Sequence, residues 1–131
     1  MDEPALHPDI EHLSFLLGRW AGEGKGEYPT VEPFAYREEV LFAHRGKPFL
    51  AYVQRTWRLP GDEPSHSEAG YLRPVGTDRL ELVLAHPTGV VEIEEGSLQG
   101  TTLALRTSNS TAASSVYRYT ASAHLPVRGK P

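Results

Sequence analysis

The stretch that decides the fold is FAYREEVLFAHRGKPFLAYVQRTW, residues 34–57. Apolar residues recur at every second position on both sides of the breaker Arg45-Gly46-Lys47-Pro48, as in two antiparallel strands joined by a turn. In the second strand, the run Phe49-Leu50-Ala51-Tyr52-Val53 places apolar side chains on both faces. Because both faces then need cover, the segment favours a closed barrel, in which one face lines an interior, over an open sheet.

The rest of the chain repeats this strand pattern after one short helix. Apolar residues recur at spacings of three and four between residues 9 and 17, which predicts an amphipathic helix with Pro8-Asp9 at its N-cap and Gly18 beyond its end. Further strands are expected at about residues 66–73, 79–86, 90–98, 101–107 and 116–124. The predicted fold is therefore all-β, an antiparallel up-and-down β-barrel of about eight strands with one short N-terminal helix.

Composition excludes several classes of function. The 131 residues predict a single domain over 1–131, and the absence of cysteine excludes disulfide scaffolds, thiolate metal sites and cysteine nucleophiles. The net charge of −4 does not favour binding to nucleic acid, so no nucleic-acid partner is expected. No apolar run reaches the length of a membrane span, so no membrane partner is expected either. The acidic start Met1-Asp2-Glu3-Pro4 does not resemble a secretory signal, and a cytoplasmic location is expected.

No catalytic residue follows from the residue pattern alone. Glu92 and Glu94 share one face of an expected strand, and we interpret this pattern as a solvated exterior rather than as paired catalytic carboxylates. The sequence contains no G-x-S-x-G nucleophile elbow. Trp20, which lies next to glycines, is expected to fill the floor of the barrel over the helix.

The motif G-x-W-x-G-x-G opens the expected first strand, with Gly18, Trp20, Gly22 and Gly24 at its fixed positions. Further blocks follow it in order: Gly26-Glu27-Tyr28-Pro29-Thr30, Phe34-x-Tyr36-x-Glu38-Glu39, Gly46-Lys47-Pro48, Gln54-Arg55-Thr56-Trp57, His66-Ser67-Glu68-Ala69-Gly70-Tyr71 and the segment from Ala85 to Gly96. Through about three quarters of the chain, this arrangement resembles the nitrobindin family.

The resemblance implies a fold, a cofactor and a reaction. Nitrobindins are ten-stranded antiparallel barrels, similar to lipocalin and fatty-acid-binding folds, that hold haem b and are usually homodimers. Their ferric iron is held by a histidine near the C-terminus, and the implied chemistry is binding of nitric oxide and isomerisation of peroxynitrite to nitrate. By position, Thr30, Phe34, His66 and His86 match residues that border the haem in the family.

Residues 101–131 diverge from the family pattern. The family's T-A-K-E-V block is matched only loosely by residues 111–116, which lack the lysine, and His124-Leu125 echoes the family's H-L pair too early in the chain. His124 is therefore the candidate iron ligand. Three hypotheses stay open: a haem-binding peroxynitrite isomerase, a barrel that has lost the haem-ligating histidine and holds another apolar ligand, and an open barrel whose strand edges pair with another chain.

The candidate residues also have structural interpretations. His66 lies early in a strand, where it is either a haem-pocket residue or a histidine at the rim, and His86 ends a strand at a turn. Thr30 follows Pro29 in a turn, so a structural role competes with a haem contact. For His124, the alternative to an iron ligand is an exposed histidine in the tail. No acidic residue follows Glu95 that could hold the second ring nitrogen of a ligand histidine there.

Overall fold

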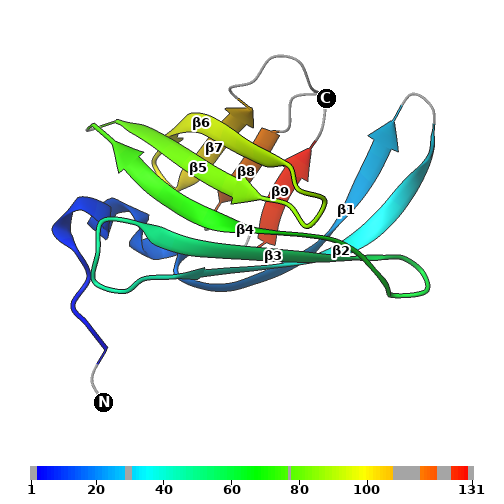
Figure 1. Ribbon diagram of the computed structural model, residues 1–131, viewed down its shortest axis with the longest axis horizontal. Coiled ribbons are helices and arrows are strands. Elements are labelled where there is room, and N and C mark those ends of the chain that lie inside the picture. The colour runs from blue at the N-terminus through cyan, green and yellow to red at the C-terminus, as the bar shows by residue number, and fades with distance from the viewer. Residues whose placement is uncertain (1–2, 29–30, 77, 108–115, 121–124, 130–131) are drawn as a thin grey trace.

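The structure is a computed structural model that describes residues 3–28, 31–76, 78–107, 116–120 and 125–129. It contains a short helix followed by a single antiparallel sheet, in which each strand pairs with the next along the chain (Figure 1). The strands are β1 Gly18–Tyr28, β2 Val31–Ala43, β3 Leu50–Arg58, β4 Glu63–Val75, β5 Arg79–Ala85, β6 Val91–Gln99, β7 Thr102–Thr107, β8 Val116–Thr120 and β9 Leu125–Gly129. The expected all-β, up-and-down architecture is confirmed.

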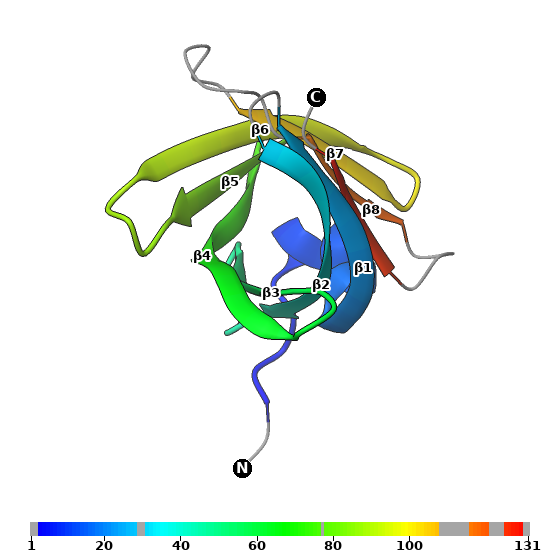
Figure 2. The same ribbon diagram turned by 90° about the vertical axis from the view of Figure 1, so that its right-hand side faces the viewer.

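The sheet curls round on itself until its first and last strands, β1 and β9, lie side by side (Figure 2). The described sheet has nine strands where about eight were expected. The difference lies at the C-terminal end, where one strand was predicted over residues 116–124. The structure instead has β8, which ends at Thr120, and β9, which begins at Leu125.

The N-terminal helix η1, Pro8–Leu16, is a 3₁₀-helix rather than an α-helix. Its N-cap is His7, whose Nδ1 accepts a hydrogen bond of 3.1 Å from the backbone N–H of Asp9, and not the predicted Pro8-Asp9 pair. Pro8 instead occupies the first turn, where its missing N–H leaves no hydrogen bond unmade. At the other end, Gly18 has φ +112°, a backbone conformation that favours glycine, and turns the chain into β1.

The helix covers one end of the curled sheet (Figure 2). Three of its side chains are fully buried, namely Ile10, Leu13 and Leu16. Trp20 on β1 is 6% exposed, and its indole Nε1–H donates to the Leu16 carbonyl at 2.8 Å, so the ring joins helix and sheet. The other apolar core residues come from inward positions of the strands: Val40, Phe42, Leu50, Tyr52, Leu72, Leu80, Leu82, Leu84, Leu103 and Leu105.

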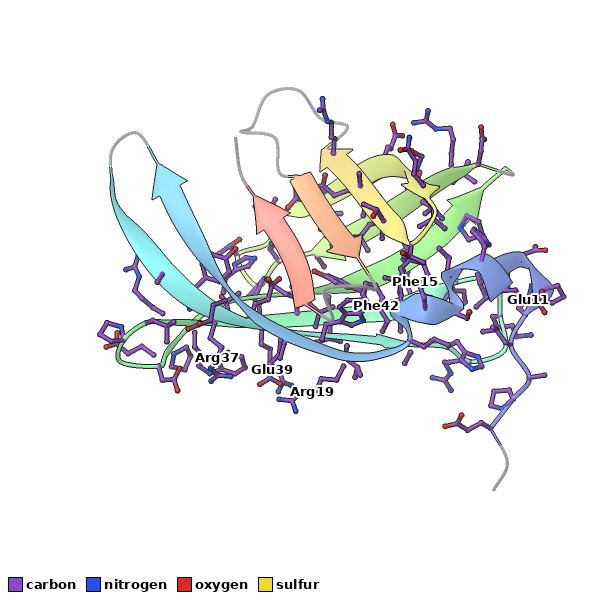
Figure 3. The ribbon with its side chains drawn as sticks, turned by 180° about the vertical axis from the view of Figure 1, so that it is seen from behind. Glu11, Phe15, Arg19, Arg37, Glu39 and Phe42 are labelled. Carbon is purple, nitrogen blue, oxygen red and sulfur yellow. The ribbon has the colours of Figure 1, made fainter. Side chains whose placement is uncertain are left out.

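The outer face of β1 and β2 carries a small charged network (Figure 3). Glu39 accepts hydrogen bonds from Arg19, with Nε to Oε2 at 2.8 Å, and from Arg37, with Nη1 to Oε1 at 3.3 Å. The hydrogen bond from Arg19, helped by the charges of both guanidiniums, holds the pKa of Glu39 below the ordinary value for a glutamate. Because the network is largely exposed, it contributes little to stability.

Among the described residues, no helix is both long enough and apolar enough to cross a membrane.

Candidate functional site

The interior of the sheet changes from apolar to polar along the strands. Close to η1 it is filled by leucines and aromatic rings, whereas farther along β2, β3, β4 and β6 the inward positions are polar. The buried polar side chains, none more than 7% exposed, are Glu38, Gln54, Thr56, Glu68 and Glu94. The ladder register explains this layer, since Glu38 lies opposite Thr56 and Gln54 lies opposite Glu68 on neighbouring strands. Buried carboxylates are costly unless they are hydrogen-bonded, so this layer marks a specialised region.

Two histidines meet at the β4–β5 edge of this layer. His66 Nε2 lies 3.1 Å from His86 Nδ1, and the two rings are tilted with centroids 5.0 Å apart. Ala69, in the middle of β4, pairs with Ala85, the last residue of β5, so His66 and His86 become neighbours although they are twenty residues apart in the sequence. His86 continues β5 into a turn, in which its N–H donates to the Val90 carbonyl at 2.9 Å.

Glu68 completes a group of three. Its Oε2 lies 3.5 Å from His66 Nε2 and 3.6 Å from His86 Nδ1. The Glu68 side chain is fully buried, the His86 side chain is 9% exposed and the His66 side chain is 41% exposed. One carboxylate oxygen and two imidazole nitrogens therefore converge at a point that solvent reaches past His66.

Further hydrogen bonds orient these three side chains. His86 Nε2 contacts Glu92 Oε1, so the ring is held from its far side. Tyr52 donates its hydroxyl to Glu68 Oε1 at 2.9 Å. The Thr56 hydroxyl accepts from the backbone N–H of His66 at 2.9 Å and donates to its carbonyl at 3.0 Å, which fixes the backbone at this point of β4. Such supported side chains keep one geometry, which a binding site requires.

The neighbouring buried pair is Gln54 and Glu38. Gln54 Nε2 donates to Glu38 Oε1 at 3.0 Å. Gln54 Oε1 is buried and has no hydrogen-bond partner among the described residues. A buried acceptor left in this state costs about 1–3 kcal/mol, which natural sites tolerate where a ligand or water supplies the donor.

Comparison with known proteins identifies the family. Residues 9–128 match the family described as the THAP4-like, heme-binding beta-barrel domain. The chain belongs to this family. The resemblance to nitrobindins that the sequence motifs carried is thereby confirmed, and the family membership supports haem as the cofactor.

Named relatives of this THAP4-like domain include peroxynitrite isomerases. The chain is 58% identical over 92 residues to peroxynitrite isomerase 2 of Mycobacterium marinum, an alignment that covers 70% of this chain and 57% of the relative. It is 58% identical over 94 residues to the peroxynitrite isomerase of Nocardia farcinica, covering 72% of this chain and 56% of the relative. The chain thus matches little more than half the length of these relatives.

A solved structure supports the same conclusion for the fold. The crystal structure of Rv2717c from M. tuberculosis superposes on this THAP4-like domain with a TM-score of 0.74 at 45% sequence identity. The match covers 87% of this chain and 81% of that one. The two chains therefore share their overall fold.

The structure describes only some of the predicted site residues of this THAP4-like domain. It brings His66 and His86 together. Thr30 and His124 lie outside the described residues. Phe34 belongs to β2 and Gly24 to β1, but only their backbone is described. Of the other motif positions, Gly18 begins β1 and Trp20 is in the core, and Gly22 lies in β1.

The interpretation of Glu92 and Glu94 as a solvated exterior was wrong. Glu94 is fully buried and lies opposite Leu82, and Glu92 lies opposite Leu84, so both positions are on the inner face. Glu68 was not among the predicted site residues, although it lies two residues beyond His66 and therefore on the same face of β4. That spacing was the available signal, since an H-x-E pair on a strand points both side chains the same way.

Proposed function

We propose that this chain is a haem b-binding barrel of the nitrobindin type that binds nitric oxide and isomerises peroxynitrite to nitrate. Its membership of a family of haem-binding barrel domains is the observation that carries the proposal. Relatives named peroxynitrite isomerases, at 58% identity, support the reaction.

The described residues fit one side of a haem site. Phe42, Leu72 and Leu84, buried in the apolar core next to η1, would border a bound haem on that side and keep water away from it. The partly exposed imidazole of His66 lies on the inner face, where it can exchange a hydrogen bond with a small bound anion. The haem would supply a ferric iron with an open coordination position for the nitrogen oxide. His124 would be the residue that holds that iron.

The first test is haem binding by the full chain and by His124→Ala. Ferric haem added to the wild-type protein should give a Soret band, and His124→Ala should shift that band and weaken haem affinity by more than about tenfold, because the bond from iron to imidazole is lost. His12→Ala is the matched control, since His12 is exposed on η1. Absence of a Soret band in the wild type would contradict the haem proposal and favour a barrel for another apolar ligand.

We also propose that the chain forms a homodimer through the outer face of β3, β4 and β5. A shallow apolar groove crosses this face, and its outward-facing lining residues are Ala51, Val53, Ala69, Tyr71, Val83, Ala85 and Val91. Tyr71 is 52% exposed and Val91 is 66% exposed, so the apolar surface is open in the single chain. Contiguous apolar patches of this kind mark interfaces, and a second copy of the chain is the partner that the family resemblance implies.

The dimer test is a mass measurement in solution. The wild type should have about twice the 14.5 kDa mass of the chain by light scattering, and Val53→Asp should reduce it to the mass of one chain, because the charge would be desolvated in the interface. Val90→Asp is the matched control, since Val90 is 54% exposed and is not among the residues that line the groove. A wild type that runs as a single chain would contradict the proposal.

A further inference from the structure

We propose that His66, Glu68 and His86 form a three-ligand site for a divalent transition-metal ion of the Zn²⁺ class. The site does not include His124, the candidate ligand of the haem iron. It uses one carboxylate oxygen and two imidazole nitrogens that lie close together in the described structure.

The spacing of the three atoms matches a tetrahedral metal. His66 Nε2, His86 Nδ1 and Glu68 Oε2 form a triangle with sides of 3.1, 3.5 and 3.6 Å. Ligand atoms about 2.0–2.1 Å from a tetrahedral zinc ion lie roughly 3.3 Å apart. An ion can therefore bind all three atoms with little movement, and one coordination position is left open.

Hydrogen-bonding contacts around the site orient two of the ligands, His86 and Glu68. Glu92 contacts His86 Nε2 and, as a carboxylate, keeps the proton on that nitrogen, so that the Nδ1 lone pair faces the other two ligands. Tyr52 donates to Glu68 Oε1 and leaves Oε2 directed at the two histidines. A carboxylate behind a metal-bound histidine is the usual arrangement in zinc sites.

The local charge and access also suit a cation. Glu68 and Glu92 are both within contact distance of His86, and the buried Glu38 and Glu94 lie on the same inner face. Metal entry is possible from the side of His66, whose side chain is 41% exposed. Two imidazoles with one carboxylate favour Zn²⁺, Co²⁺ or Cu²⁺ over Mg²⁺ and Ca²⁺, which prefer sites made of oxygen ligands.

A hydrogen-bonded pair of neutral histidines is the competing explanation for the 3.1 Å contact between the rings. That arrangement needs no metal. The two explanations predict different results when metal ions are added. Only a metal site binds one ion per chain and needs all three side chains to do so.

The experiment measures metal uptake by the full chain, purified without haem and treated with a chelator. Equilibrium dialysis against Zn²⁺ should give one ion per chain, and Co²⁺ should give the visible absorption of a tetrahedral complex. Mg²⁺ and Ca²⁺ should leave Zn²⁺ uptake unchanged. Because haem is absent, the result is independent of the Soret measurement, and the failure of one proposal leaves the other intact.

Four variants define the ligands. His66→Ala, which removes a partly exposed side chain, and Glu68→Gln, which keeps the shape of the side chain, should each weaken Zn²⁺ binding by more than about 100-fold. Glu92→Gln should weaken it by about 10- to 100-fold. His12→Ala should bind as the wild type does. Wild-type protein without stoichiometric Zn²⁺, or His66→Ala and Glu68→Gln with wild-type affinity, would overturn the proposal.

Discussion

Replacing Gly70 by Ala should destabilise the protein by about 3 kcal/mol or more, because the added methyl group would collide with backbone rather than with a movable side chain. A Cβ at residue 70 would lie 1.6 Å from the carbonyl oxygen of Val83 and 2.7 Å from its carbonyl carbon. Gly70 pairs with Tyr52 on β3 and with Leu84 on β5, so relief of the clash would separate strands at the centre of the sheet. Urea denaturation would measure the loss.

Gly61→Ala is the control for this prediction. Its Cβ would meet only the far end of the Glu63 side chain, with Oε1 at 2.8 Å, and that side chain can rotate away. We expect a change within about 0.5 kcal/mol, as for other surface substitutions. Equal stabilities for Gly70→Ala and Gly61→Ala would show that β4 and β5 do not approach as closely as the structure has them.

Replacing Trp20 by Ala should cost about 3–5 kcal/mol, the usual range for removing a buried tryptophan. The ring is 6% exposed and packs with the core at the end of the sheet that η1 covers. Its loss would leave a cavity and would also remove the hydrogen bond from the indole Nε1–H to the Leu16 carbonyl. Because that hydrogen bond joins the helix to the sheet, hydrogen exchange of Trp20→Ala should show a larger loss of protection, relative to the wild type, in η1 than in the strands.

Trp20→Phe separates packing from hydrogen bonding. Phenylalanine keeps most of the apolar contact but leaves the Leu16 carbonyl without its donor, so we expect a loss of about 1–3 kcal/mol. If Trp20→Ala and Trp20→Phe were equally stable, the ring would not be filling the core as described.

The polar layer inside the barrel is where the structure adds most to the function. A carboxylate, Glu68, is buried between two histidines and a tyrosine hydroxyl, and a glutamine acceptor nearby has no partner among the described residues. Such groups weaken a fold unless hydrogen bonds satisfy them, and a bound ligand can supply a missing partner. The metal proposal makes Glu68 a ligand, whereas the haem proposal uses the neighbouring His66, and the experiments above test the two proposals separately.

Strands and turns are the elements that the sequence predicted best. The alternation in Leu80, Leu82 and Leu84 predicted β5 within a residue of its observed bounds, Arg79–Ala85. It was weakest at the ends of elements. The expected helix is a 3₁₀-helix. The strand predicted at about 66–73 is the longer β4, Glu63–Val75, because pairing with β3 extends it to Glu63 and pairing with β5 extends it to Val75.

The sequence by itself determined that the chain is a series of short antiparallel strands with a nitrobindin-type motif, because strand periodicity and turn residues are local properties. Only the tertiary structure decided which face of each strand is inside. Alternation divides residues into two sets without saying which set is buried, and pairing of Leu82 with Glu94 places that glutamate in the interior. The same register brings His66 to His86, a contact that depends on neighbouring strands and not on sequence spacing.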